Sequence, residues 1–413
     1  MKKTQTFLLT ALAALMAAPA SAAFVDDAQS RVELRNFYFN RDFRQSGAAQ
    51  SKADEWAQGF MLNFESGYTD GTVGFGLDAL GMLGIKLDSS PDRTGTGLLP
   101  PHDDGRAADE YSKLGLTAKM RYSESELFLG TLMPKLPILQ PNTSRILPQT
   151  FRGGMATINE FDNLSIDFGR LTKATDRDST DAEDLALNNK NRRFGGSFSA
   201  DQLDWAGLNY QFNSSLAASY YLAQLDDIYR QHFFGLNHSA ALGAGELSTE
   251  LRVAVSDEQG AAQAGRIDNQ AWQGRIGYAL NGHEVSAAAQ KMRGDSAFPY
   301  IDGSNPYLVN FVQINDFANA DERSWQARYD YNFAAMGVPG LTATVRYITG
   351  NNVDTGLGYE GRDRERDLDI GYAVQSGALK GLGIRVRNAM ARSNYRSDID
   401  ENRLTLVYTW QLF

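Results

Sequence analysis

The feature that most constrains this chain is a side-chain alternation with a period of two, which recurs along most of its length. In residues 325–333 (WQARYDYNF), one set is Trp, Ala, Tyr, Tyr and Phe, and the other is Gln, Arg, Asp and Asn. A β-strand places alternate residues on opposite faces, whereas a helix would scatter both sets around its circumference. The same alternation appears in residues 247–255, 272–278, 367–374 and 403–411. The sequence therefore predicts an all-β protein whose strands have one apolar and one polar face.

The connections between these runs fall into two kinds. Residues 69–72 (TDGT) and 213–214 (NS) predict tight hairpin turns. Long, polar and charged connections are expected at residues 89–109, 172–193, 300–323 and 350–366. Short turns that alternate with long loops are typical of a transmembrane antiparallel β-barrel with its turns in the periplasm and its loops outside.

The N-terminus has the parts of a secretory signal. Two lysines precede an apolar stretch over residues 7–18, and small residues follow it. We expect residues 1–22 to be a signal peptide, cleaved near Ala22 or Ala23, and residues 23–413 to form one barrel domain. A membrane anchor is the alternative, but the apolar stretch is shorter than the roughly 20 residues that a spanning helix needs.

Composition narrows the class of protein further. The chain has 22 Phe, 18 Tyr, 5 Trp and no cysteine, so it is not a small disulfide-stabilised module. A soluble β-sandwich or propeller is the alternative, but aromatic residues near strand ends fit the interfacial girdles of a membrane barrel better. Closure of a barrel also satisfies the backbone in lipid. At roughly 20 residues per strand and loop, about 16 to 20 strands would form, and such a barrel holds water inside.

Charge and motifs bear on what passes through such a barrel. The net charge is −10, and −12 without the two lysines of the signal peptide. An anion channel remains compatible, because passage depends on the local field in the pore. The four histidines form no metal-binding pair, and neither a nucleophile elbow nor a basic tract for nucleic acid occurs. We expect that the protein is not an enzyme and that it has no metal, no cofactor and no nucleic-acid partner. A barrel that carries an enzymatic or adhesin function is the least favoured alternative.

Residues 132–153 predict a constriction loop that folds into the barrel. Four of the 11 prolines fall here, which excludes a central strand. The segment is also too apolar for a solvated outer loop. We expect its apolar side chains to pack against the inner wall, and Ser144 and Arg145 to face the passage. An apolar surface loop is the alternative.

Eight segments, in order along the mature chain, carry a resemblance to a known family. They are 34–42 (LRNFYFNRD), 58–60 (QGF), 71–76 (GTVGFG), 94–97 (TGTG), 144–150 (SRILPQT), 227–231 (DIYRQ), 324–330 (SWQARYD) and 337–341 (GVPGL). Together they resemble the OprD family, the outer-membrane carboxylate channels of pseudomonads and related Gram-negative bacteria. The resemblance implies a monomeric barrel of 18 strands, surrounded by outer-membrane lipid and lipopolysaccharide and narrowed by inward-folded loops.

The family lines one pore wall with a ladder of basic residues. Arg145 matches the arginine of its Ser-Arg-x-x-Pro-Gln-Thr loop, Arg385 and Arg387 match an Arg-x-Arg pair in a late strand, and Arg403 matches the arginine that opens the last strand. Further ladder positions in matching segments are Arg35, Arg41, Lys119 and Arg121. Strand parity agrees for Arg385, Arg387 and Arg403, which lie on polar faces. A structural ion pair inside the barrel is the alternative for each arginine.

The predicted function is passive diffusion of small carboxylates across the outer membrane. Guanidinium groups can replace the hydration of a carboxylate, and basic side chains select anions in pores. The constriction loop is most similar to that of members that handle aromatic monocarboxylates; basic amino acids and short dicarboxylates are the other solutes considered. A non-selective diffusion porin is the alternative function. Phe413 ends the chain with a parity opposite to Trp410 and Tyr408, unlike many outer-membrane barrels.

Overall fold

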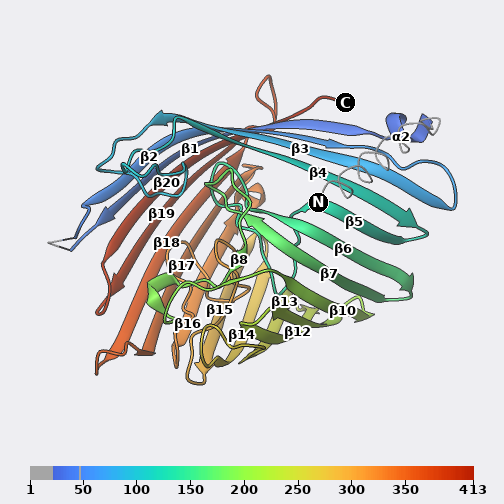
Figure 1. Ribbon diagram of the computed structural model, residues 1–413. Helices are drawn as coiled ribbons and strands as arrows, with labels where there is room; N and C mark the ends of the chain where they lie inside the picture. Colours follow the sequence, from blue (N-terminus) through green and yellow to red (C-terminus); the bar gives the residue numbers. More distant parts are fainter. Residues whose placement is uncertain (1–21, 46–47) are drawn as a thin grey trace.

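The structure, a computed structural model, describes residues 22–45 and 48–413. Its strands form one closed antiparallel barrel, shown as a ring of arrows in Figure 1, and 18 of them belong to a single sheet. Consecutive strands pair in order, and β1 pairs with β20 to close the ring. The predicted all-β barrel of about 18 strands is therefore confirmed. The expected signal peptide lies, apart from its last residue, outside the described residues.

The barrel strands are long, and one chain supplies all of them. They are β1 (Gln29–Phe43), β2 (Lys52–Glu65), β3 (Val73–Asp88), β4 (Glu110–Tyr122), β5 (Ser125–Leu132), β6 (Thr150–Phe161), β7 (Leu164–Thr175), β10 (Leu203–Asn213), β11 (Leu216–Leu225), β12 (Tyr229–Leu242), β13 (Gly245–Glu258), β14 (Asp268–Leu280), β15 (His283–Arg293), β16 (Arg323–Asn332), β17 (Leu341–Asp354), β18 (Glu360–Ala373), β19 (Gly383–Ser393) and β20 (Ile399–Gln411). The remaining elements are α2 (Ala22–Asp26), the short pair β8 (Leu185–Ala186) and β9 (Ser199–Ala200), and the 3₁₀ helices η1 (Lys190–Arg192) and η2 (Phe333–Met336). Among the described residues, no helix is long and apolar enough to cross a bilayer.

The alternation places apolar side chains outside and polar side chains inside. Trp325 is 51% exposed and Trp272 is 47% exposed, whereas Gln326 and Gln273, their neighbours of opposite parity, are each 6% exposed. A water-soluble sheet would bury its apolar face. Outward-facing aromatic and aliphatic residues are what a barrel in lipid requires.

The connections at one end of the barrel are short, and those at the other end are mostly long. The turn expected at 213–214 is a two-residue turn between β10 and β11. The turn expected at 69–72 is part of a longer connection, 66–72, because Gly67 donates a hydrogen bond to the carbonyl of Phe24 in α2. The long loop expected at 350–366 is wrong. Strands β17 and β18 extend through most of that segment, and its charged side chains alternate between the two faces of the wall.

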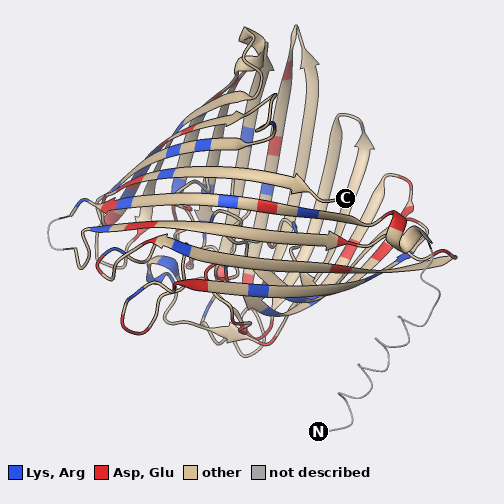
Figure 2. Ribbon diagram, turned by 90° about the horizontal axis from the view of Figure 1, so that it is seen from above, with Lys and Arg blue, Asp and Glu red and all other residues tan. Residues whose placement is uncertain are grey.

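The loop between β5 and β6 comprises residues 133–149, a shorter range than the 132–153 expected from the sequence, because both strands extend into it. Its apolar residues Leu136, Ile138 and Leu139 are buried. Two further long loops, 176–202 and 294–322, are packed against it. Figure 1 shows the segment that carries β8 inside the ring of strands. Figure 2 shows acidic and basic bands crossing several neighbouring strands of the wall.

Candidate functional site

One side of the barrel interior is filled by apolar side chains. Residues of the three inward loops, among them Leu139, Leu187 and Phe298, form one cluster with wall residues such as Phe151 and Tyr229. All five are at most 4% exposed. Ions and polar solutes are excluded from such a closely packed apolar region. A passage through the barrel must therefore run along the other side, next to β1 and β18–β20.

Two cavities lie on that other side, one above the other. The loop-side cavity, of about 910 Å³, is lined by residues of the long loops and by the loop ends of β18–β20. The turn-side cavity, of about 400 Å³, is lined by the turn ends of β17–β20 and by β1. Ser144, Arg145 and Arg387 line both cavities. These three residues mark the place where the cavities meet, and we call it the constriction.

Arg145 is held on the constriction loop by backbone oxygen atoms. Its Nε donates to the carbonyl of Thr96 (2.8 Å), and its Nη1 donates to the carbonyl and hydroxyl of Ser144, each at 3.0 Å. Arg35 fixes the same loop from β1, because its Nη1 donates to the carbonyl of Arg145 at 2.6 Å. Burial, and then the positive charges of Arg403 and Arg177, lower the pKa of the Arg145 guanidinium. Among the described residues no carboxylate lies at ion-pair distance from Arg145, and the nearby charge of Glu401 offsets only part of this effect.

An aromatic ring organises the arginines of the constriction. The Phe39 side chain on β1 is fully buried, and the guanidinium carbons of Arg145, Arg403 and Arg41 lie 4.8, 5.1 and 5.2 Å from its ring centroid. Cations are attracted to the face of an aromatic ring at such distances. Glu401, also fully buried, pairs with Arg41 (2.6 Å) and Arg403 (2.5 Å). Three cations and one carboxylate leave this group with a net positive charge.

Arg387 and Arg385 share the inner face of β19 but differ in their partners. Arg385 forms an ion pair with Asp369 on β18. Arg387 has no ion pair or hydrogen bond with any described residue, and its buried Nε has no acceptor. It lies directly opposite Arg403 in the β19–β20 register. Of the ladder residues expected from the sequence, Arg145 and Arg387 are thus the two at the constriction that no carboxylate neutralises.

Two expected ladder residues lie elsewhere in the structure. Lys119 forms an ion pair with Asp78 (2.6 Å) and donates to the carbonyl of Ser66 (2.8 Å). Arg121 lies 4.4 Å from the ring centroid of Tyr68. Both therefore belong to a cluster at the turn end of β3 and β4 and line neither cavity of the passage. Strand parity gives the face of a side chain but not its height in the barrel, so the sequence could not separate these residues from the constriction.

Sequence reasoning missed the contribution of the loop 294–322. Its residue Gln313 donates to Glu401, and the carbonyl of Gln313 accepts from Arg403. Arg193 of the loop 176–202 forms an ion pair with Asp316 (2.5 Å), in which both side chains are buried. The loop is irregular, and no alternation in its sequence indicated that it would return to the wall. Loop 294–322 therefore lines the loop-side cavity together with loop 133–149 and contacts the acid and arginine next to the constriction.

The loop-side cavity also contains groups that the sequence did not single out. Arg177 lines it with a buried Nε that has no acceptor, and the buried amide nitrogen of Asn315 also has none. Asp176 and Asp302 line it as acidic groups. Burial, and then the charges of Asp302 and Asp178, raise the pKa of the Asp176 carboxyl to about 6.

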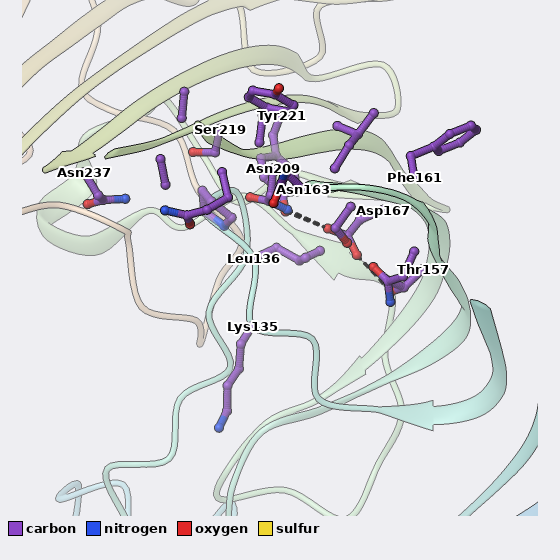
Figure 3. A pocket seen from close by; sticks show the side chains of 18 of the residues that line it. Lys135, Leu136, Thr157, Phe161, Asn163, Asp167, Asn209, Ser219, Tyr221 and Asn237 are labelled. Carbon is purple, nitrogen blue, oxygen red and sulfur yellow. Dashed lines mark hydrogen bonds between the residues drawn. The ribbon is translucent and has the colours of Figure 1, made fainter. Parts of the chain in front are cut away.

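A third cavity, of about 1030 Å³, lies near the turn end of β6–β12 and shares no lining residue with the other two. Figure 3 shows Asp167 among its lining residues, with Lys135 and Leu136 of the constriction loop nearby. Asp167 accepts hydrogen bonds from Thr157 (2.9 Å) and Tyr221 (2.8 Å). Leu136 belongs both to this lining and to the apolar cluster. The cavity is therefore a polar recess next to the apolar cluster and separate from the passage.

A closed barrel with an apolar exterior and a narrow, arginine-lined passage defines an outer-membrane channel protein. The family model for "outer membrane porin, OprD family" matches residues 22–412, and the chain belongs to this family. It is 39% identical to the porin-like protein GalP of Pseudomonas putida over 98% of this chain and 97% of that protein. Among solved structures, OccK9 (OpdG) of Pseudomonas aeruginosa superposes with a TM-score of 0.92 at 48% identity, covering 94% of this chain and 100% of that one.

A second solved structure adds a bound molecule. OpdK of Pseudomonas aeruginosa, determined with vanillate, superposes with a TM-score of 0.88 at 41% identity, over 94% of this chain and 100% of that chain. The relatives are porins, so the predictions of an outer-membrane location and of a channel rather than an enzyme are confirmed.

Proposed function

We propose that this porin is selective for small carboxylates, which bind transiently at Arg145 and Arg387. The observation that carries the proposal is that, among the described residues, neither guanidinium group has a carboxylate at ion-pair distance, although both line the two cavities where these meet. A buried cation without a counter-ion is costly, and an entering anion removes that cost. Four other arginines form ion pairs with acids of the wall: Arg35, Arg41, Arg385 and Arg403. We propose that they position the lining of the passage and do not bind the solute directly.

Unsatisfied hydrogen-bond donors support the same solute class. The Nε atoms of Arg387 and Arg177, the amide nitrogen of Asn315 and the hydroxyl of Thr405 are buried along the passage and have no partner among the described residues. Buried donors in proteins are nearly always paired. Carboxylate oxygens are strong acceptors and would pair with them in succession. The solute would move from one group to the neighbouring one, so it would not bind tightly at any single site.

Aromatic monocarboxylates are the proposed solutes within this class. Leu99, Phe311 and Val312 line the loop-side cavity together with the arginines, so an aromatic ring has apolar surface available beside the cationic groups. Vanillate, present in the OpdK structure, is an acid of this kind. We propose benzoate as the simplest probe.

The test is a planar-bilayer recording of the purified protein. We expect the reversal potential in a KCl gradient to indicate anion preference. We also expect the benzoate current to saturate as the benzoate concentration rises. A non-selective porin would show neither, and either absence would refute the proposal. Replacement of KCl by potassium benzoate or by a positively charged amino acid salt separates the solute classes.

A further inference from the structure

A group of basic residues lies on the outside of the barrel near its loop end, away from the passage. Lys291 and Arg293 are at the end of β15, Arg323 begins β16, and Arg364 and Arg366 lie in β18. We propose that these five residues, the outer basic patch, bind the phosphate groups of lipopolysaccharide in the outer leaflet. The site would be a lipid-binding surface that is separate from solute transport.

Strand alternation fixes the direction of the β18 side chains. Asp363, Glu365 and Asp367 are 2%, 0% and 2% exposed, which shows that they point into the barrel. Arg364 and Arg366, which alternate with them, are exposed on the outer face. In a strand, residues of opposite parity lie on opposite faces of the wall. These two arginines therefore point away from the passage.

The patch continues across the neighbouring strands. Arg323 is exposed between Glu322 and Ser324, which are 0% and 5% exposed, and it lies directly opposite Lys291 in the β15–β16 register. One strand, β17, separates Arg323 from β18, and its residue Thr349 is the register partner of Arg364. Neighbouring strands are about 5 Å apart, so the cations of β16 and β18 are within reach of one phosphorylated headgroup.

These cations lack acidic partners, and Arg366 donates a hydrogen bond to the Asn388 side chain. In the described part of the chain, none of the five has a carboxylate at ion-pair distance. The acids at the edge of the patch are Asp321, which is exposed, Glu360, which pairs with Arg362 at 3.6 Å, and Asp295, which pairs with Arg266 at 2.8 Å. Counting the described residues, the five cations outnumber the neighbouring acids, so the patch has a net positive charge.

The height of the patch matches the headgroup region. Arg366 is the register partner of Tyr347 on β17, which is 40% exposed, and Lys291 is the partner of Trp272, which is 47% exposed. Outward aromatic residues of this kind mark the membrane–water interface. A cation deeper in lipid would cost free energy, whereas at this height it meets anionic headgroups. The long-loop end of such barrels faces outward, and there the anionic lipid of the Gram-negative outer membrane is lipopolysaccharide.

The experiment measures binding of fluorescently labelled lipid A, with both phosphates present, to the full-length protein in detergent. The double variant Arg323→Gln/Arg364→Gln is compared with Arg106→Gln/Lys173→Gln, which removes two cations that pair with the loop acids Asp104 and Asp184. Each basic residue near an anionic lipid surface contributes a few-fold in affinity, so the patch variant should bind roughly 10- to 30-fold more weakly. The loop variant should bind as the wild type does.

Three results would overturn the proposal. The first is equal lipid A binding by the two double variants. The second is that the wild-type protein binds dephosphorylated lipid A as tightly as the phosphorylated form. The third is that it binds phosphatidylglycerol vesicles as tightly as lipid A, which would indicate a general preference for anionic lipid. Single-channel conductance of the patch variant should stay at the wild-type value, because the patch lies outside the passage. A variant that is unfolded would be recognised by loss of this conductance, and a charge-retaining variant, Arg323→Lys/Arg364→Lys, should then restore both folding and binding.

Discussion

Replacement of Arg387 by glutamine is the most direct perturbation of the constriction. The change removes one of the two guanidinium groups there that have no ion pair with a described carboxylate, and it leaves a shorter, uncharged polar side chain. A hydrogen bond to a charged group contributes about 1.5 to 3 kcal/mol. Because the passage is hydrated, we take the lower value, which corresponds to roughly a ten-fold loss of affinity for a carboxylate.

The structure also predicts the effect of this change on stability. Arg387 has no internal ion pair to lose, and it faces Arg403 directly across the β19–β20 ladder. Like charges directly opposite each other in a sheet are destabilising. The Arg387→Gln barrel should therefore unfold at the wild-type temperature or slightly above it, so a loss of transport could not be attributed to a damaged fold.

The assay is the benzoate concentration that gives half-maximal current in planar bilayers. The matched control is Arg328→Gln, which removes an inward arginine of β16 that pairs with Asp330 and lines neither cavity of the passage. A roughly ten-fold rise is expected for Arg387→Gln and no change for the control. A change of less than two-fold for Arg387→Gln, or equal changes for both variants, would refute the assignment of Arg387 as a carboxylate contact.

Further predictions concern the groups around the constriction. Phe39→Leu removes the ring shared by three guanidinium groups and should weaken benzoate binding roughly two- to five-fold, whereas Phe151→Leu, in the apolar cluster, should not alter the half-saturating concentration. Because the pKa of Asp176 is raised to about 6, its negative charge is lost as pH falls from 7 to 5. Anion preference, measured as reversal potential, should therefore rise over this range, and Asp176→Asn should show the low-pH value at both pH values. Arg35→Met removes the hydrogen bonds to the constriction loop, each contributing about 1.5 to 3 kcal/mol, and should increase open-channel current noise; equally quiet wild-type and variant channels would contradict this role.

The sequence alone was sufficient to predict the strands that form the wall of the barrel. Alternation is a local property of a strand, so residues such as Trp325 and Gln326 could be assigned to opposite faces without any knowledge of their partners. The same local signal failed at 350–366, where a high content of charge resembled a loop. There the charged residues alternate between the two faces of a strand, the acids pointing into the barrel and the arginines outward.

The passage itself depended on the tertiary structure. Ser144 and Arg145 were predicted from their loop, but the loop 294–322 and the ring of Phe39 bring their neighbours together from segments far apart in the sequence. Single partners decided which arginines keep an unpaired charge. Asp369 pairs with Arg385, whereas no described carboxylate pairs with Arg387. Strand periodicity is encoded by adjacent residues, whereas the pairing of a charge depends on which side chains the closed barrel places within a few ångströms. For that physical reason, composition and spacing predicted the wall and the face on which each arginine lies, and only the folded chain decided which of them meet at the constriction.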